Sequence, residues 1–224
     1  MKFYSLILAA AVLVWNNECH AQLSDIQPLW PNGIPGNPVK YKAEKLTSNT
    51  FRQSSLSRSN RVFSCVSEPG YVIHKPENGK ANGAAMVICP GGGFSAGGSL
   101  SMMVALNMYE KELPGYASFG QINTAPDFVG LFYPGLNPGY MDMAKKAGTF
   151  PPVFIMNGGE DTTTPAANCI ELCNILTSKK ISVEMHIYSK GGHGFDSGVE
   201  RGYGIASWRD SFEAWLKDRG FIAE

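Results

Sequence analysis

The sequence predicts an α/β domain whose β-sheet is mainly parallel and flanked by helices. From residue 61 onward, short apolar runs of strand length alternate with segments of helix length, and this order produces a parallel sheet. Turns rich in glycine and proline separate the runs. The 224-residue chain has no internal repeat and is long enough for one domain with a sizeable core. We therefore expect one α/β domain over residues 61–224.

The first 21 residues have the features of an export signal. Lys2 supplies a positive charge, Phe3 to Trp15 forms an apolar run, and Cys19-His20-Ala21 places small residues before a cleavage site at Gln22. The apolar run is short for a bilayer span, so a retained anchor is a minor alternative, and lipid attachment at Cys19 is a weaker one. We expect residues 1–21 to be a signal peptide, the protein to be secreted or periplasmic, and no stable membrane span to remain after cleavage.

The segments before the main sheet are expected to be less regular. Residues 22–60 are rich in proline, glycine, asparagine and lysine and then in serine, which predicts an N-terminal surface arm. Residues 61–67 and 71–74 have strand composition around a turn at 68–70, which predicts that they pair with each other. Ala85 to Cys89 is a short apolar run of the kind found in buried parallel strands.

The rest of the chain alternates between expected helices and strands. The expected strands are Phe128–Tyr133, Pro151–Met156 and Ile181–Tyr188. The expected helices are Leu100–Glu112, Ala166–Leu176 and Ile205–Lys217, the last with Trp208, Phe212, Ala214 and Trp215 facing the core. Because folds of this kind place their sites beyond the carboxyl ends of the strands, residues just after each strand are the first functional candidates.

Composition and charge exclude several classes of protein. Apolar residues make up 44% of the chain and charged residues 17%, which excludes a disordered acidic or basic chain. Nineteen basic residues balance nineteen acidic residues, so no overall field attracts the protein to nucleic acid or to an anionic membrane. We expect neither as a partner.

Four cysteines remain once the expected signal is removed, namely Cys65, Cys89, Cys169 and Cys173. They permit two disulfides in an oxidising compartment. Cys169 and Cys173 lie four residues apart on an expected helix, which suits two core-facing thiols better than a bridge. The sequence has no C-x-x-C motif or histidine-rich partner that would bind zinc. We expect no metal and no organic cofactor.

A glycine-rich run follows Ala85 to Cys89 and contains the strongest candidate nucleophile. Gly93-Phe94-Ser95-Ala96-Gly97 matches the G-x-S-x-G pattern of a nucleophile elbow, in which the serine hydroxyl is presented for attack. The overlapping Pro90-Gly91-Gly92-Gly93 is similar to the glycine loop that supplies oxyanion amides in the same enzymes. The G-x-S-x-G pattern alone is weak evidence, because so short a pattern also arises by chance.

An acid and a histidine follow Ser95 in the order that this kind of hydrolase uses. Asp161 comes just after one expected strand, and His193 comes just after another within Gly191-Gly192-His193-Gly194. Asp161 also suits a helix cap, His193 also suits an ordinary glycine-flanked turn, and Glu160 is the alternative acid. The order and placement of all three residues together favour a serine, histidine and aspartate triad.

At these motifs the chain closely resembles secreted bacterial α/β-hydrolases of the acetyl xylan esterase or lipase-like esterase type. The resemblance is carried, in the order found in that family, by Leu29–Gly36, Val87–Gly98, Pro126–Phe128, Tyr133–Pro134, Pro151–Phe154, the Asp161 loop and His186–Phe195. It implies an α/β-hydrolase fold that acts on small-molecule or polysaccharide esters. The implied reaction is removal of O-acetyl groups from a plant polysaccharide such as xylan.

The resemblance also implies a role for each motif residue. Ser95 corresponds to the nucleophile, His193 to the general base and Asp161 to the acid that orients the base. The backbone amides of the oxyanion hole correspond to Gly92 or Gly93 and to Ala96.

The chain departs from the family where the glycine loop and the elbow meet. In the family the two motifs lie on different strands, whereas here they overlap, so about two βα units, roughly 60 to 100 residues, are missing. The single run Ala85 to Cys89 must then serve both motifs, which predicts activity well below that of an intact relative. The alternatives are a catalytically impaired or inactive remnant, which could still bind carbohydrate, and a peptidase of the same fold.

Overall fold

The structure is a computed structural model that describes residues 26–28, 45–52, 57–64, 70–73, 75, 83–89, 97–106, 125–195 and 203–223. The expected signal peptide lies outside these ranges, as do Ser95 and the three expected oxyanion residues, Gly92, Gly93 and Ala96.

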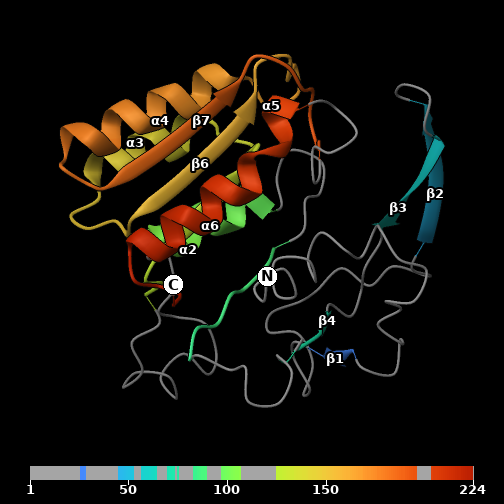
Figure 1. Ribbon diagram of the computed structural model, residues 1–224, viewed down its shortest axis with the longest axis horizontal. Helices are drawn as coiled ribbons and strands as arrows, with labels where there is room; N and C mark the ends of the chain where they lie inside the picture. Colours follow the sequence, from blue (N-terminus) through green and yellow to red (C-terminus); the bar gives the residue numbers. More distant parts are fainter. Residues whose placement is uncertain are drawn as a thin grey trace.

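The central feature is a three-stranded parallel sheet in the order β5-β6-β7 (Figure 1). Strand β5 spans Val129–Phe132, β6 spans Val153–Gly158 and β7 spans Val183–Tyr188. Val153 of the middle strand pairs with Val129 on one side and with Val183 on the other. The three strands expected from the apolar runs are therefore confirmed, and so is their parallel arrangement.

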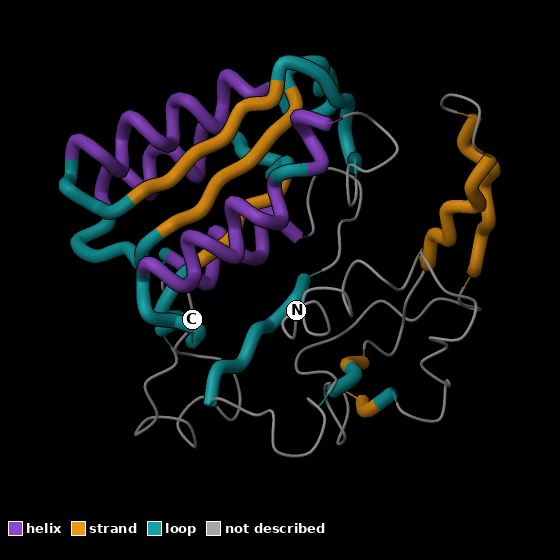
Figure 2. Tube along the Cα trace, in the orientation of Figure 1, coloured by secondary structure: helices purple, strands orange, loops and turns teal. Residues whose placement is uncertain are grey.

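Helices cover both faces of this sheet (Figures 1 and 2). On one face lie α2 (Gly97–Ala105), α3 (Pro138–Lys146) and α4 (Ala166–Ser178). On the other lie α5 (Tyr203–Ala206) and α6 (Trp208–Asp218). Because side chains alternate along a strand, the middle strand sends residues to both layers, and all six of its residues are buried. The α/β architecture with a mainly parallel sheet is confirmed.

The two faces of the sheet differ in chemistry. Val153 and Ile155 contact the aliphatic layer beneath α3 and α4, whereas Phe154 and Met156 contact an aromatic layer beneath α6. The ring of Phe154 is fully buried and lies 5.0 Å from the ring of Phe212 and 5.7 Å from that of Trp215. Large aromatic side chains contribute the most to a core per residue, so this aromatic layer holds α6 on the sheet.

The helices largely follow expectation, with one addition. Helix α4 and the closing helical segment lie where they were expected, although the latter is divided at Ser207. Ala214 is exposed and Leu216 is buried instead. Helix α3 was not expected. Its N-cap is Asn137, whose side chain accepts a hydrogen bond from the Tyr140 amide at 3.2 Å, and Pro138 suits the first helical position.

The prediction of a strand at Ala85–Cys89 is wrong. These residues form no strand, and Val87 is 89% exposed. A parallel strand is stable in a sheet only when a neighbour satisfies its backbone groups and helices cover it. Within the described ranges the parallel sheet ends at β5, so the apolar composition of this run does not place it in the core.

The expected pairing of residues 61–67 with 71–74 is also wrong. Strand β3 (Ser57–Ser64) pairs antiparallel with β2 (Lys45–Arg52), and β4 (Gly70–Tyr71) pairs with β1 (Gln27–Pro28). The β2–β3 register joins Arg52 to Ser57, which is a short hairpin connection. The β2–β3 hairpin pairs eight residues of each strand, whereas residues 71–74 could pair with at most four, so the longer ladder satisfies more backbone hydrogen-bonding groups.

Candidate active site

Three loops meet at the carboxyl edge of the parallel sheet. They are residues 133–137 after β5, residues 159–165 after β6 and residues 189–195 after β7. In open α/β sheets this edge is where ligands and catalytic groups gather. The loop after β6 carries Asp161 and the loop after β7 carries His193, so the topology brings the two candidates from the sequence to one place.

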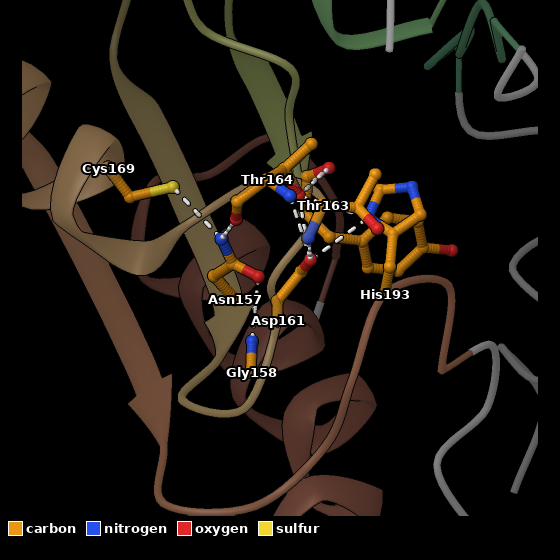
Figure 3. A network of polar contacts seen from close by, with 8 residues as sticks. Asn157, Gly158, Asp161, Thr163, Thr164, Cys169 and His193 are labelled. Carbon is orange, nitrogen blue, oxygen red and sulfur yellow. Dashed lines mark hydrogen bonds and ion pairs between the residues drawn. The ribbon is translucent and has the colours of Figure 1, made fainter. Parts of the chain in front are cut away.

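Asp161 is fully surrounded by hydrogen-bond donors (Figure 3). Its side chain is 0% exposed. Oδ1 accepts from the amides of Thr163 at 2.9 Å and Thr164 at 2.8 Å, which closes a turn at the end of the strand. Oδ2 lies 2.7 Å from the Thr164 hydroxyl and 2.9 Å from Nδ1 of His193. Burial alone would raise the pKa of Asp161, but hydrogen bonds from Thr164 and His193 outweigh burial and lower it.

His193 contacts the protein through one ring nitrogen, and no contact of its other ring nitrogen is found among the described residues. Its Nδ1 contacts Asp161 Oδ2, and 36% of its side chain is exposed. An ionised carboxylate can only accept hydrogen bonds, so in the neutral imidazole Nδ1 carries the proton and Nε2 has the free lone pair. The ring edge also packs on Tyr133, with centroids 5.4 Å apart. A histidine held in this way can act as a general base through Nε2.

Two glycines let the acid and histidine loops approach each other. A Cβ on Gly158 would collide with the carbonyl of Gly191. Gly191 itself has φ of +107°, and the side chain of Ile205 on α5 occupies the space where its own Cβ would lie. The amide of Glu160 donates to the Gly191 carbonyl at 3.2 Å, which joins the loops directly. Glycine at these positions is therefore a condition for the contact between Asp161 and His193.

Glu160, the alternative acid, contacts the backbone of the loop that carries His193 and not the imidazole ring. Its Oε2 accepts a hydrogen bond from the Gly191 amide at 3.1 Å. The carboxylate that meets the imidazole is that of Asp161. The structure therefore gives the two neighbouring carboxylates different tasks: Glu160 ties down the loop, and Asp161 contacts the ring.

Asn157 and Thr164 form a buried support that was not predicted from the sequence. Asn157 is 0% exposed, and its Nδ2 donates to the Thr164 carbonyl at 2.7 Å and contacts Cys169 Sγ at 3.6 Å. Its Oδ1 accepts from the Gly158 amide at 2.8 Å. The available sequence signal was an amide side chain directly after the apolar run Val153–Met156 of β6, because a buried polar group requires partners.

The helix that follows Ser95 begins beside this site. Gly98, in the first turn of α2, lies so close to Pro134 that an added Cβ would be 2.8 Å from its Cα. The Ser99 hydroxyl donates to the Gly135 carbonyl at 3.3 Å. Tyr133, which flanks His193, immediately precedes these residues and has φ of +38°. The N-terminus of α2 is thus anchored to the loop that borders the histidine.

The remaining candidate groups of the described residues form no second site. His186 lies on β7 and contacts Glu184 of the same strand at 2.8 Å. Cys89, Cys169 and Cys173 are free thiols; Cys169 is buried, which raises its pKa to about 11, and the other two are partly exposed. The described ranges hold no group of three or more histidine, cysteine or acidic side chains arranged to bind a metal ion. Within the same ranges, every helix is too short or too polar to cross a bilayer.

Comparison with known families supports the fold assignment. The sequence profile of the prolyl oligopeptidase family matches residues 136–219, a segment that contains β6, β7, Asp161 and His193. The chain has an α/β-hydrolase fold, of which the described residues supply a three-stranded portion of the parallel sheet and its flanking helices. No curated protein sequence matches the chain.

Several solved structures are similar over part of their length. An acetyl ester-xyloside bifunctional hydrolase from Caldicellulosiruptor lactoaceticus shares 22% identity, with a TM-score of 0.46 over 56% of this chain and 54% of that one. Esterase Est2 from Thermogutta terrifontis shares 19%, with a TM-score of 0.42 over 57% and 53%. The carboxylesterase Cest-2923 from Lactobacillus plantarum shares 14%, with a TM-score of 0.40 over 56% of each chain. The chain thus spans about half the length of these proteins.

Proposed function

We propose that the protein is a serine carboxylester hydrolase in which Ser95, His193 and Asp161 form the catalytic triad. The observation that supports this most directly is the 2.9 Å contact between His193 Nδ1 and the buried Asp161 carboxylate. It leaves Nε2 of a part-exposed imidazole free to accept a proton, which is the arrangement that acyl transfer by a serine requires.

The proposed reaction proceeds through an acyl-enzyme. His193 Nε2 takes the proton of the Ser95 hydroxyl as the serine oxygen attacks the ester carbon, and then gives this proton to the departing alcohol. Water then attacks the acyl carbon while His193 takes a proton from it; the bond to the Ser95 oxygen breaks, the carboxylic acid is released, and His193 returns the proton to Ser95. Amides of Gly92 or Gly93 and of Ala96 are the proposed donors to the negatively charged oxygen.

Chain connectivity supports the participation of Ser95. Ser95 precedes Gly97, the first residue of α2, by two positions, so their Cα atoms can be at most about 7 Å apart. The first turn of α2 packs on Pro134, and the adjacent Tyr133 touches the ring of His193. A short reach from the start of this helix would suffice to bring the serine to the base.

The proposed substrates are small-molecule or polysaccharide esters, in particular O-acetyl groups on a plant polysaccharide such as xylan. This part of the proposal rests on the resemblance of the motifs from Leu29 to Phe195 to acetyl xylan esterases. A secreted or periplasmic location, through a signal peptide at residues 1–21, would give the enzyme access to such a polymer. N-terminal sequencing of the exported protein tests the location, with Gln22 as the expected first residue.

Two alternatives each have an observation in their favour. The exposure of Val87 on a run that forms no strand favours an impaired or inactive remnant that retains only carbohydrate binding. The match of residues 136–219 to the prolyl oligopeptidase profile favours a peptidase. A substrate panel separates the three: acetylated xylan and p-nitrophenyl acetate for the esterase, and a proline-containing p-nitroanilide peptide for the peptidase.

The deciding experiment compares hydrolysis of p-nitrophenyl acetate by the unaltered chain, Ser95→Ala and Ser178→Ala. Ser178 is an exposed serine at the end of α4, so its substitution serves as the matched control. We expect Ser95→Ala to abolish turnover and Ser178→Ala to retain it. Equal rates from the unaltered chain and Ser95→Ala would overturn the esterase proposal.

A further inference from the structure

We propose that Thr164 is a positioning residue for His193: its hydroxyl holds the imidazole in one tautomer and one orientation. This inference rests on the proposed function, because it assigns Thr164 a part in the same site. The residue follows Asp161 by three positions in the loop between β6 and α4 and is 1% exposed. Its side chain therefore lies in the protein interior, between the acid and the base.

The Thr164 hydroxyl lies among three groups, which come from all three loops of the site. Oγ1 is 2.7 Å from Asp161 Oδ2, 3.0 Å from His193 Nδ1 and 3.2 Å from the carbonyl oxygen of Tyr133. A hydroxyl carries one hydrogen and two lone pairs. The shortest contact is to an ionised carboxylate, and such charge-assisted bonds are the strongest of this type, so the hydrogen points mainly to Asp161.

The direction of that hydrogen reinforces the tautomer of His193 that the Asp161 carboxylate favours. With the hydroxyl proton directed at Asp161, the lone pairs of Oγ1 remain for Nδ1 of His193. Nδ1 then faces two acceptors, Asp161 Oδ2 at 2.9 Å and Thr164 Oγ1 at 3.0 Å. A proton on Nδ1 is shared between two oxygens, whereas an unprotonated Nδ1 would place its lone pair against the carboxylate. The hydroxyl therefore favours the tautomer with Nε2 free, which is the catalytic form.

The loop leaves Thr164 little freedom to move away. Its amide donates to Asp161 Oδ1 at 2.8 Å, and its carbonyl accepts from Asn157 at 2.7 Å. A β-branched side chain with both backbone groups fixed has a restricted χ1. The position of the hydroxyl is thus set by the backbone and does not depend on the imidazole, as positioning requires.

The contact with Tyr133 extends this role to the third loop. Tyr133 has a left-handed backbone conformation with φ of +38° that non-glycine residues seldom adopt, and its carbonyl lies within reach of Thr164. The same tyrosine ring packs against His193. Thr164 and Tyr133 together restrict the ring of His193, one through its Nδ1 edge and the other through an aromatic contact.

The test uses four variants of the full chain. Thr164→Val removes the hydroxyl and keeps the branched shape. Thr164→Ala and Thr164→Ser both remove the methyl group and differ from each other by the hydroxyl oxygen, so this pair decides the question even if the valine variant does not fold. Thr162→Val is the matched control, because Thr162 lies in the same loop and is exposed.

Two readouts distinguish positioning from a structural role. In ¹⁵N-histidine-labelled protein near pH 8, the shifts of Nδ1 and Nε2 of His193 report which nitrogen holds the proton, and this needs no turnover. With p-nitrophenyl acetate, we expect Thr164→Val and Thr164→Ala to lose about 10- to 100-fold in kcat with little change in KM, as for loss of one bond to a charged group. Thr164→Ser and Thr162→Val should stay near the unaltered chain in both readouts.

Failure of this inference is distinct from failure of the proposed function. If Ser95→Ala is as active as the unaltered chain, the esterase proposal fails, and the ¹⁵N shifts still decide the role of Thr164. The inference would be overturned if Thr164→Ala and Thr164→Ser had the same ¹⁵N shifts and the same kcat. The positioning role would also be refuted if both variants lower the urea midpoint equally while the Nδ1–H tautomer stays unchanged.

Discussion

Replacing Asp161 by asparagine tests the proposed site most directly, because this change alters hydrogen-bond direction and leaves size almost unchanged. In Asp161→Asn the remaining carbonyl oxygen can still accept from the amides of Thr163 and Thr164. The new amide nitrogen would then replace Oδ2 and become a donor. It would face Nδ1 of His193 and the Thr164 hydroxyl, both of which donate to Oδ2 in the unaltered chain.

The structure allows both neighbours to adapt to the new donor. The Thr164 hydroxyl can turn its hydrogen to the Tyr133 carbonyl, 3.2 Å away. His193 can lose its Nδ1 proton and carry the proton on Nε2 instead. Each group then accepts from the asparagine, and no donor of this cluster is left unpaired. We therefore expect the free energy of unfolding to fall by only about 1–2 kcal/mol, the value of the lost charge-assisted component.

The catalytic effect should be much larger than the effect on stability. A proton on Nε2 removes the lone pair that would accept the serine proton, so the wrong tautomer predominates. In a serine protease, replacing the triad aspartate by asparagine gives the wrong histidine tautomer and costs about 10⁴-fold in kcat. We expect a fall of about 10³- to 10⁴-fold here.

The assay measures kcat for p-nitrophenyl acetate beside urea unfolding of the same samples. A variant that keeps kcat within about tenfold of the unaltered chain would refute the assignment of Asp161. A variant that loses most of its folding free energy would refute the proposed rearrangement of the hydroxyl and the imidazole.

Three further outcomes are expected from the structure. Phe154→Ala should lower the free energy of unfolding by about 3–5 kcal/mol in urea, because the ring is fully buried against Phe212 and Trp215 of α6; a loss below about 1 kcal/mol would contradict this packing. Val87→Asp should change it by less than about 0.5 kcal/mol, because the side chain is 89% exposed; a loss above about 2 kcal/mol would indicate a buried strand. The pKa of Asp161 is lowered in the folded state, so its ionised form stabilises the fold above the unfolded pKa of about 3.9. Acidification below about pH 4 should therefore lower the urea midpoint more steeply for the unaltered chain than for Asp161→Asn. Parallel curves of urea midpoint against pH would contradict this role of the carboxylate.

The parts of the fold that depend on local sequence patterns could be predicted from the sequence. The runs that became β5, β6 and β7 are apolar and bounded by turn residues, and their order with helices predicts the parallel arrangement. The meeting of Asp161 and His193 could be predicted because each follows one of these strands, and parallel strands bring such positions to one edge.

The incorrect and missing predictions arise where the outcome depends on neighbours that the sequence does not reveal. Ala85–Cys89 has the composition of a buried strand, but burial requires an adjacent strand and covering helices. Helix α3 is short, and its main local signals are Asn137 and Pro138, which also suit a turn. Thr164 has the sequence features of an ordinary helix-flanking residue; its position between acid and base is evident only when loops from three strands are brought together.

The thiol of Cys169 gives the protein a built-in reporter of motion at this edge of the sheet. It is 0% exposed, its pKa is raised to about 11, and it contacts the Asn157 amide that supports the Thr164 carbonyl. A thiol reagent can react with it only after α4 and the end of β6 separate and expose the sulfur to water. The alkylation rate of Cys169, followed by peptide mass spectrometry, therefore measures how often the support beneath the acid opens, with the partly exposed Cys173 on the same helix as the internal reference.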